Sequence, residues 1–430
     1  MLTGLVLFGL FFVFLLLEFP IALCLGISSV LTLMIFHLMP LESVPFVAQQ
    51  MFSAVDSFNL LAIPLFIITG TLLGQSGISQ RLINLANALV GRWKAGLALV
   101  AIIVSIFFAG ISGSGPADTA ALGLILIPAL VARGYPKDFS AALMAAGGGI
   151  GIIIPPSIAL IIYGVVADAS ISQLFIAGII PGILIGGSLS VYCLWKFRND
   201  SRIQADTTPI PLGKAFKDAI WGLLAPVVIL GGIYSGIFTP TEAAAVAVIY
   251  AFLVDRVIYK ELSFKQVREI FNQSGITSAS VLFIIACASL FSWILNSQGI
   301  ASGLASTLLQ YVGNKYILLL LMNLILIWAG CFLDAISIFY IFLPIFMPIC
   351  RHFGIDPVHF GVIMTVNLAI GQITPPVGVN LFVASSISNV PVKILSKAAF
   401  PLILVESVVL ILITYLPFLS LWLPHYLGVK

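Results

Sequence analysis

Charged residues are scarce in this chain. Only 8% of its 430 residues are Asp, Glu, Lys or Arg, whereas 61% are hydrophobic. Soluble domains carry about 25% charged and about 45–50% apolar residues. The composition therefore excludes a water-soluble fold, and a net charge of only +3 argues against nucleic acid as a partner.

Motifs for nucleotide hydrolysis and for catalysis are also missing. The sequence contains no G-x-x-x-x-G-K loop to bind ATP phosphates, so any uphill transport would have to use an ion gradient. The five cysteines show no C-x-x-C spacing, and the four histidines form no metal-ligand cluster. No Ser/His/Asp or His/Glu set lies at a shared depth, so we do not expect an enzyme.

Long apolar runs fill the chain instead. About a dozen occur, from Leu2–Leu17 at the start to Ala399–Leu416 near the end. Several are shorter than the roughly 20 residues that cross a bilayer as a straight helix. We predict an all-α polytopic membrane protein in which some segments do not cross directly.

Basic residues gather in two loops. One runs from Lys196 to Lys217 and the other from Arg256 to Arg268, with two apolar runs between them. An even number of crossings puts both loops on one side, and the positive-inside tendency makes that side cytoplasmic. Counting spans back from these loops predicts a periplasmic N-terminus.

Glycine and proline positions repeat at an offset of 220 residues. Seven coincide within the 72 positions of Gly110–Pro181, including Pro155-Pro156 with Pro375-Pro376, where chance gives about 0.7. These residues set backbone shape, so the repeat indicates a repeated chain trace. Five single spans separate the copies, and this odd number predicts that the second copy is inverted.

Two interruptions occur in each copy. They lie at Gly110–Pro116 and Gly151–Ser157 in the first copy, and at Gly330–Ser337 and Gly371–Gly378 in the second. The arms flanking the first interruption are about 15 residues long, or ~22 Å as helix, shorter than the ~30 Å hydrocarbon core. The pattern predicts a re-entrant helical hairpin followed by a discontinuous helix, twice, as an inverted structural repeat.

Unwound backbone inside a bilayer points to a binding site. Freed carbonyl and N–H groups cost several kcal/mol each unless they line a cavity. Exposed oxygens suit a hard cation, and half-helix N-termini favour an anion. The polar residues near the interruptions are Ser112, Ser114, Asp118, Thr119, Asp334, Ser337, Thr374 and Asn380.

Two intramembrane carboxylates need separate interpretation. Asp334 is expected to bind a cation directly or through a neighbour, and the alternative is that it caps a half-helix. For Asp118, capping and cation binding both stay open.

The chain resembles the large membrane subunit of tripartite ATP-independent periplasmic (TRAP) transporters, of the DctM/SiaM type, nearly end to end. The motifs that carry the resemblance are D-S-F-N-L-L-A-I-P-L-F (56–66), F-F-A-G-I-S-G-S-G-P-A-D-T-A-A-L-G (107–123), G-I-I-I-P-P-S-I-A-L-I-I-Y-G (151–164), F-I-A-G-I-I-P-G (175–182), G-G-I-Y-S-G-I-F-T-P-T-E-A-A-A (231–245), F-L-D-A-I-S (332–337) and G-Q-I-T-P-P-V-G-V-N-L-F-V (371–383).

This resemblance implies sodium-coupled uptake of an organic acid anion, of the sialic acid or C4-dicarboxylate class, in a bacterial inner membrane. It implies an elevator-type transport domain on a scaffold, a separate small four-helix membrane subunit, and a periplasmic substrate-binding protein. We expect two or more Na⁺ sites. The expected Na⁺ ligands are Ser112, Ser114, Gly151, Asp334, Ser337, Gly371, Thr374 and Pro375. The expected substrate contacts are Ser112, Gly113, Pro155, Pro156, Ser157, Pro376 and Asn380.

The expected domain division follows the repeat. Residues 1–93 form scaffold spans with an interfacial helix, and 196–296 form central scaffold spans with the basic loops. Transport repeat 1 covers 94–195, with its hairpin at 94–131 and its broken helix at 139–167. Transport repeat 2 covers 297–398, with its hairpin at 315–350 and its broken helix at 358–388. A C-terminal span occupies 399–430.

Other functions remain open at this point. A self-sufficient ion-coupled anion permease would need no binding protein, and a channel would use the hairpins as a filter. A membrane enzyme lacks the residues for catalysis.

Overall fold

The computed structural model describes residues 2–38, 44–203 and 210–429, and within these ranges the regular structure is entirely helical. Among the described residues, seven helices are long and apolar enough to cross a membrane. Shorter apolar helices of 10–17 residues accompany them. The prediction of an all-α polytopic membrane protein is confirmed.

The helices divide evenly between the two halves of the chain. The first half contains α1 (Leu2–Leu16), α2 (Ile21–Ile35), α3 (Val44–Val55), η2 (Phe58–Leu61), α4 (Ala62–Gln75), α5 (Ile78–Val90), α6 (Gly96–Ser112), α7 (Gly115–Ala132), α8 (Lys137–Gly149), η3 (Ile150–Ile152), α9 (Ile158–Ala167) and α10 (Ile171–Phe197). The second half contains α11 (Leu212–Tyr234), α12 (Pro240–Leu253), η4 (Val254–Tyr259), α13 (Phe264–Ser297), α14 (Ile300–Tyr311), α15 (Lys315–Gly330), α16 (Ala335–His352), α17 (Pro357–Gly371), α18 (Val379–Ser388), α19 (Val392–Tyr415) and α20 (Phe418–Leu427).

The repeat extends far beyond the positions marked by Gly and Pro. Adding 220 residues to α7 gives the bounds of α16, and the same offset brings α5 onto α14 and α10 onto α19 within two residues at each end. It also places α3 and α4 over the two halves of α13. Matching prolines (Pro181 and Pro401) mark α10 and α19 in the sequence, and the structure adds the equivalence of α3 and α4 with α13.

Both predicted interruptions occur in each copy. The first hairpin turns at Gly113 and Ser114, between α6 and α7, and the second turns at residues 331–334, between α15 and α16. Residues 153–157 separate η3 from α9, and residues 372–378 separate α17 from α18. The Pro155-Pro156 and Pro375-Pro376 bonds are both cis. The hairpin and broken-helix architecture is confirmed.

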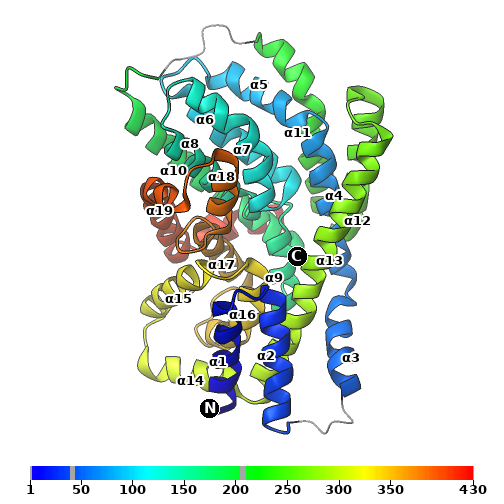
Figure 1. Ribbon diagram of the computed structural model, residues 1–430, viewed down its shortest axis with the longest axis vertical. Helices are drawn as coiled ribbons and strands as arrows, with labels where there is room; N and C mark the ends of the chain where they lie inside the picture. Colours follow the sequence, from blue (N-terminus) through cyan, green and yellow to red (C-terminus); the bar gives the residue numbers. More distant parts are fainter. Residues whose placement is uncertain (1, 39–43, 204–209, 430) are drawn as a thin grey trace.

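Each hairpin packs against the broken helices of both copies. Helix α7 of the first hairpin contacts α8 and also α18 of the other copy. Helix α16 of the second hairpin contacts α17 and also α9 of the first copy. Figure 1 shows α17 in the middle of the molecule, with α18, α7 and α8 above it and α16 below it.

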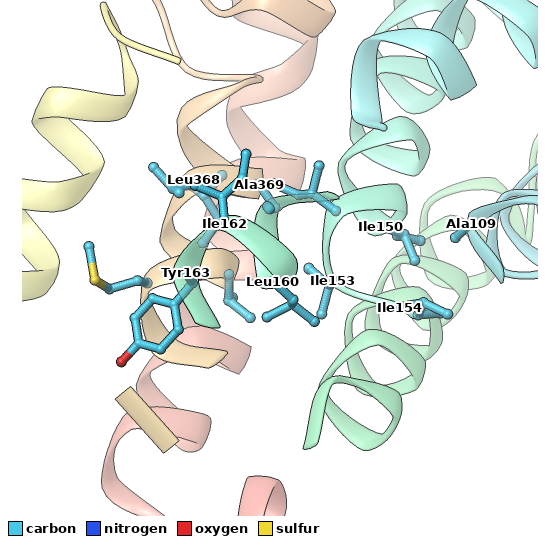
Figure 2. Packing of buried hydrophobic residues seen from close by; sticks show 14 of the residues in the cluster. Ala109, Ile150, Ile153, Ile154, Leu160, Ile162, Tyr163, Leu368 and Ala369 are labelled. Atoms are coloured by element: carbon cyan, nitrogen blue, oxygen red, sulfur yellow. The ribbon is translucent and has the colours of Figure 1, made fainter. Parts of the chain in front are cut away.

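Apolar packing holds the first unwound segment in place. Ile150 lies beside Ala109 of α6, while Leu368 and Ala369 of α17 lie beside Ile162 of α9 (Figure 2). The hydroxyl of Tyr163 donates to the carbonyl of Pro357 at 2.6 Å, which ties α9 to the start of α17. The two broken helices therefore pack directly on each other.

The described residues of the two basic loops lie at one end of the molecule. Figure 1 shows the start of α11, the end of α12 and helix α5 at the top, and the N-terminus and α14 at the bottom. Arg81 of α5 pairs with Glu261 at 2.6 Å and stacks over the Tyr259 ring at 3.9 Å. Met1 lies outside the described residues, and the compartment that each end faces remains a prediction.

Candidate functional site

The tip of the first hairpin is bonded to the first unwound segment. Gly113 has a left-handed conformation (φ +66°), and its carbonyl accepts a hydrogen bond from the Ile158 amide at 3.3 Å. A Cβ at Gly113 would lie 2.5 Å from the Pro156 carbonyl oxygen. Only glycine fits this contact, because both the backbone conformation and the space exclude a side chain.

The second hairpin makes the corresponding contact. The carbonyl of Cys331 accepts hydrogen bonds from the Val377 amide at 3.2 Å and the Gly378 amide at 3.4 Å. Gly378 is the repeat equivalent of Ile158. In each copy, amides at the junction between the unwound segment and the next helix therefore donate hydrogen bonds to the hairpin tip.

Asp118 is fully buried in the first turn of α7, and it does not cap that helix. The N-cap residue is Ser114, and no side-chain capping bond forms there. The Ser112 hydroxyl donates to Asp118 Oδ1, whereas Oδ2 has no hydrogen-bond partner and faces Gly151. Of the two roles left open for Asp118, capping is wrong.

Two further buried oxygens lack a donor, Gln372 Oε1 and Asn380 Oδ1. Both side chains reach across from the second copy to Gly115, where α7, α8 and α18 meet. The Asn380 amide nitrogen donates to the Ala145 carbonyl at 3.1 Å. Buried oxygens without donors are costly, and a carboxylate with carbonyl-type oxygens is a donor set that fits a hard cation such as Na⁺.

Gln372 is a functional candidate that the sequence reasoning missed. It directly follows Gly371 and is a polar side chain inside an apolar run. The sequence shows this polar residue, but it does not show that the Gln372 side chain approaches the first copy.

Asp334 has the geometry of a helix cap. Its Oδ2 accepts hydrogen bonds from the Ile336 and Ser337 amides at 3.0 and 3.4 Å, and its Oδ1 accepts one from the Ser337 hydroxyl at 2.6 Å. An ionised carboxylate has about four lone-pair sites, so capping leaves room for a cation. Cation binding by Asp334 stays a prediction.

The remaining predicted site residues differ in whether their polar groups already form hydrogen bonds within the protein and in whether they are exposed. The Ser157 hydroxyl donates to the Ile152 carbonyl at 2.5 Å and caps α9, and the Thr374 hydroxyl donates to the Ile370 carbonyl at 2.6 Å. Pro155 and Pro156 are buried, whereas Pro375 and Pro376 are exposed. Gly371 packs against Gly330, with a Cβ there only 2.7 Å from the Gly330 Cα.

A cavity of about 520 Å³ adjoins the first hairpin tip. Its lining residues come from α4, α6, α7 and α13: Ile67, Gly70, Thr71, Gly74, Gln75, Phe108, Ser112, Ser114, Ala117, Ala120, Ala121, Leu124, Ile125 and Thr277. At the tip, Gly70 approaches the Ser112 backbone so closely that a Cβ would lie 2.9 Å from its Cα. The lining residues of α4 and α7 each form a stripe that runs from this tip toward the end where α5 begins.

The equivalent region of the second copy is closed. Helix α16 packs on α13, and beside it the gap between α1, α15 and α16 measures only about 30 Å³. The gap is lined by Phe8, Phe11, Phe12, Trp328, Ala329, Phe332, Leu333, Ile341 and Phe342. The two hairpins thus differ in their relation to the neighbouring helices, although their backbones are equivalent.

Two inverted copies of a hairpin and a broken helix, joined around buried oxygens and a cavity, define a membrane transport protein. The chain belongs to the family described as "Tripartite ATP-independent periplasmic transporter, DctM component", whose sequence profile matches residues 8–419. The resemblance found in the sequence is confirmed.

Several named relatives match most of the chain. It is 44% identical to the isethionate TRAP transporter permease protein DctMQ of Oleidesulfovibrio alaskensis, over 96% of this chain and 65% of that protein. It is 37% identical to the C4-dicarboxylate TRAP transporter large permease protein DctM of Rhodobacter capsulatus, over 99% and 100%. It is 39% identical to the sialic acid TRAP transporter large permease protein SiaM of Vibrio cholerae, over 89% and 90%. These relatives are permeases by name, so the chain is a transporter subunit and not an enzyme.

A solved structure shares the fold. The YdaH transporter of Alcanivorax borkumensis, described as having an unusual topology, superposes with a TM-score of 0.63 at 16% identity, over 90% of each chain. At this identity the likeness concerns the fold alone.

Replacing Gly113 with alanine tests the contact between the hairpin tip and the unwound segment. We expect Gly113→Ala to destabilise the protein by roughly 1–3 kcal/mol and to reduce uptake at least tenfold, because its Cβ meets the Pro156 carbonyl. The matched control is Gly187→Ala in α10, where a Cβ meets nothing within 4 Å. Thermal unfolding and uptake would be measured for both, and equal behaviour of the two variants would contradict the assignment.

Proposed function

We propose that this chain carries out sodium-coupled secondary active uptake of an organic acid anion by an elevator mechanism. A periplasmic binding protein delivers the anion, and a separate small four-helix membrane subunit completes the transporter. The observation that carries the proposal is that three buried oxygens near the first hairpin, on Asp118, Gln372 and Asn380, have no hydrogen-bond donor.

A sodium ion would supply the positively charged partner that the buried oxygens lack. A cation beside Asp118, Gln372 and Asn380 would compensate the carboxylate and the unpaired amide oxygens. The first predicted sodium site uses Ser112, Ser114 and Gly151 near this point. The second uses Asp334, Ser337, Gly371, Thr374 and Pro375 at the other tip. Two sites in equivalent positions support a stoichiometry of at least two.

The anion would bind in the cavity against the start of α7. Because the N-cap Ser114 makes no side-chain capping bond, the Gly115 and Ala117 amides in the first turn of α7 remain available to an anion, while Pro116 has no amide hydrogen. Ser114 adds a hydroxyl, whereas the Ser112 hydroxyl already donates to Asp118. The named relatives transport isethionate, C4-dicarboxylates and sialic acid, which supports organic anions as the substrate class.

The difference between the copies supports alternating access. An inverted repeat has a second state in which the two copies exchange their arrangements. In that state α7 would pack on α4 as α16 now packs on α13, and a cavity would open beside α16. With the basic loops in the cytoplasm, the present cavity opens inward. Sodium and substrate would favour movement by stabilising the loaded unit in both states.

Uptake into proteoliposomes tests the function and its alternative. We expect accumulation of the anion only with an inward sodium gradient and with both partner proteins present. Accumulation by this chain alone would instead favour a self-sufficient permease. Flux that does not saturate and ignores the sodium gradient would indicate a channel.

The role of Asp334 in sodium binding can be tested with a variant that still caps α16. Asparagine caps helices about as well as aspartate, so Asp334→Asn should keep the fold while abolishing sodium-dependent uptake. Asp334→Ala should also lose about 0.5–2 kcal/mol of stability with the cap. The measurements are uptake against sodium concentration and thermal unfolding. An unchanged sodium dependence in Asp334→Asn would remove this residue from the site.

A cross-link tests whether the two copies exchange their packing, so that α7 packs on α4. Thr71 and Ala121 line opposite walls of the cavity, and their repeat equivalents are Phe291 and Ile341, in the closed copy. The Phe291 ring packs edge-on against Phe8, which lines the small gap with Ile341.

In the other state, Thr71 and Ala121 should therefore come close together. A short bifunctional thiol reagent should link T71C to A121C and stop uptake, while each single variant stays active, since all five native cysteines are buried. Full uptake after treatment, with no link formed at any sodium concentration, would argue against the movement.

A further inference from the structure

The cavity beside the first hairpin has an uncharged lining, and groups that could stabilise a negative charge lie at one end only. None of its fourteen described lining residues carries a formal charge. On the helices that form it, α4 and α6 contain no charged residue, and α7 contains only Asp118, which is buried and accepts a hydrogen bond from the cavity-lining Ser112. The charged residues of α13 (Lys265, Arg268 and Glu269) lie more than two helical turns from Thr277.

Groups that stabilise a negative charge are confined to the inner end. There the Ser114 hydroxyl and Ala117 lie at the uncapped N-terminus of α7, whereas the Ser112 hydroxyl already donates to Asp118. Beyond them the walls are apolar, with Ile67, Phe108 and Leu124 among the lining side chains. One anionic group can be accommodated at this end, and the walls next to it suit a neutral body.

The outer part of the cavity offers neutral polar groups only. Thr71 and Gln75 of α4 and Thr277 of α13 provide two hydroxyls and one amide. Such groups satisfy a hydroxyl, keto or amide group of a ligand, but none brings a positive charge. A second carboxylate held here would be desolvated without a counter-charge, which costs far more than placing a hydrogen-bonded neutral group.

We infer that the transported anion carries a single charge, held at the Ser112–Ser114 end, with a neutral polar or apolar remainder directed toward Gln75. This inference rests on the proposed function, and it selects monoanions over dicarboxylates within the organic acids. The selection arises in this chain itself, because the cavity walls discriminate after any binding protein has released its cargo.

Matched pairs of acids test the inference on the purified chain in lipid nanodiscs. Succinamate and succinate share one carbon skeleton and differ in one charge, and gluconate and glucarate form a second such pair. We expect sodium-dependent thermal stabilisation by the monoanion of a pair at a concentration at least tenfold lower than for the dianion. Replacement of sodium by choline should remove the effect.

Two lysine variants test whether a positive charge in the cavity is what a dianion lacks there. Gln75→Lys places a cation at the outer part of the cavity and should lower the succinate concentration needed for stabilisation at least tenfold. Gln80→Lys adds the same charge on exposed α5 outside the cavity and should change nothing.

The outcomes distinguish failure of the inference about charge from failure of the proposed function. Stabilisation of the wild-type chain by succinate as strong as by succinamate, with no gain in Gln75→Lys, overturns the inference and leaves sodium-coupled transport intact. If no organic acid of either pair stabilises any variant in sodium, the proposed function fails and the inference fails with it.

Discussion

Inside a bilayer no water competes for backbone hydrogen bonds, so every break in a helix must find its partners within the protein. The hairpin tips provide these partners. The Gly113 carbonyl accepts a hydrogen bond from the Ile158 amide at the start of α9, and the Cys331 carbonyl accepts from the Val377 and Gly378 amides at the end of the second unwound segment, all at 3.2–3.4 Å. Hairpin and broken helix therefore form one unit in each copy. Movement of a hairpin without its broken helix would leave these groups unpaired, which is why we expect the unit to move as a whole.

The two copies share a backbone but differ in chemistry. Ser114 in the first copy corresponds to Asp334 in the second, whereas Asp118 corresponds to Ile338. Each tip thus holds one carboxylate, at a different position along the hairpin. One carboxylate is tied by helix amides and the other keeps an oxygen without a donor. Two cation sites built this way would differ in strength, because the competing protein hydrogen bonds differ.

Prediction from the sequence succeeded where backbone shape depends on residue type. Gly113, Pro156 and Gly378 lie in the interruptions because only Gly or Pro suits such backbone. The same reasoning did not extend the repeat to α3, α4 and the two halves of α13, which share no Gly or Pro at the repeat offset. It also left Asp118 between two roles, because a residue four positions into a helix can cap or point inward. The choice depended on where Ser112 and Gly151 lie in space.

By itself the sequence determined the membrane environment, the inverted repeat and the positions of the four interruptions, since composition and backbone-shaping residues encode them locally. The tertiary structure alone decided which oxygens meet. Gln372 and Asn380 reach Gly115 across more than 250 residues of chain, and no local pattern encodes that approach. It likewise decided that α16 packs on α13 while α7 leaves a cavity beside α4. Equivalent backbones permit either arrangement, and only the packing of the whole molecule selects one.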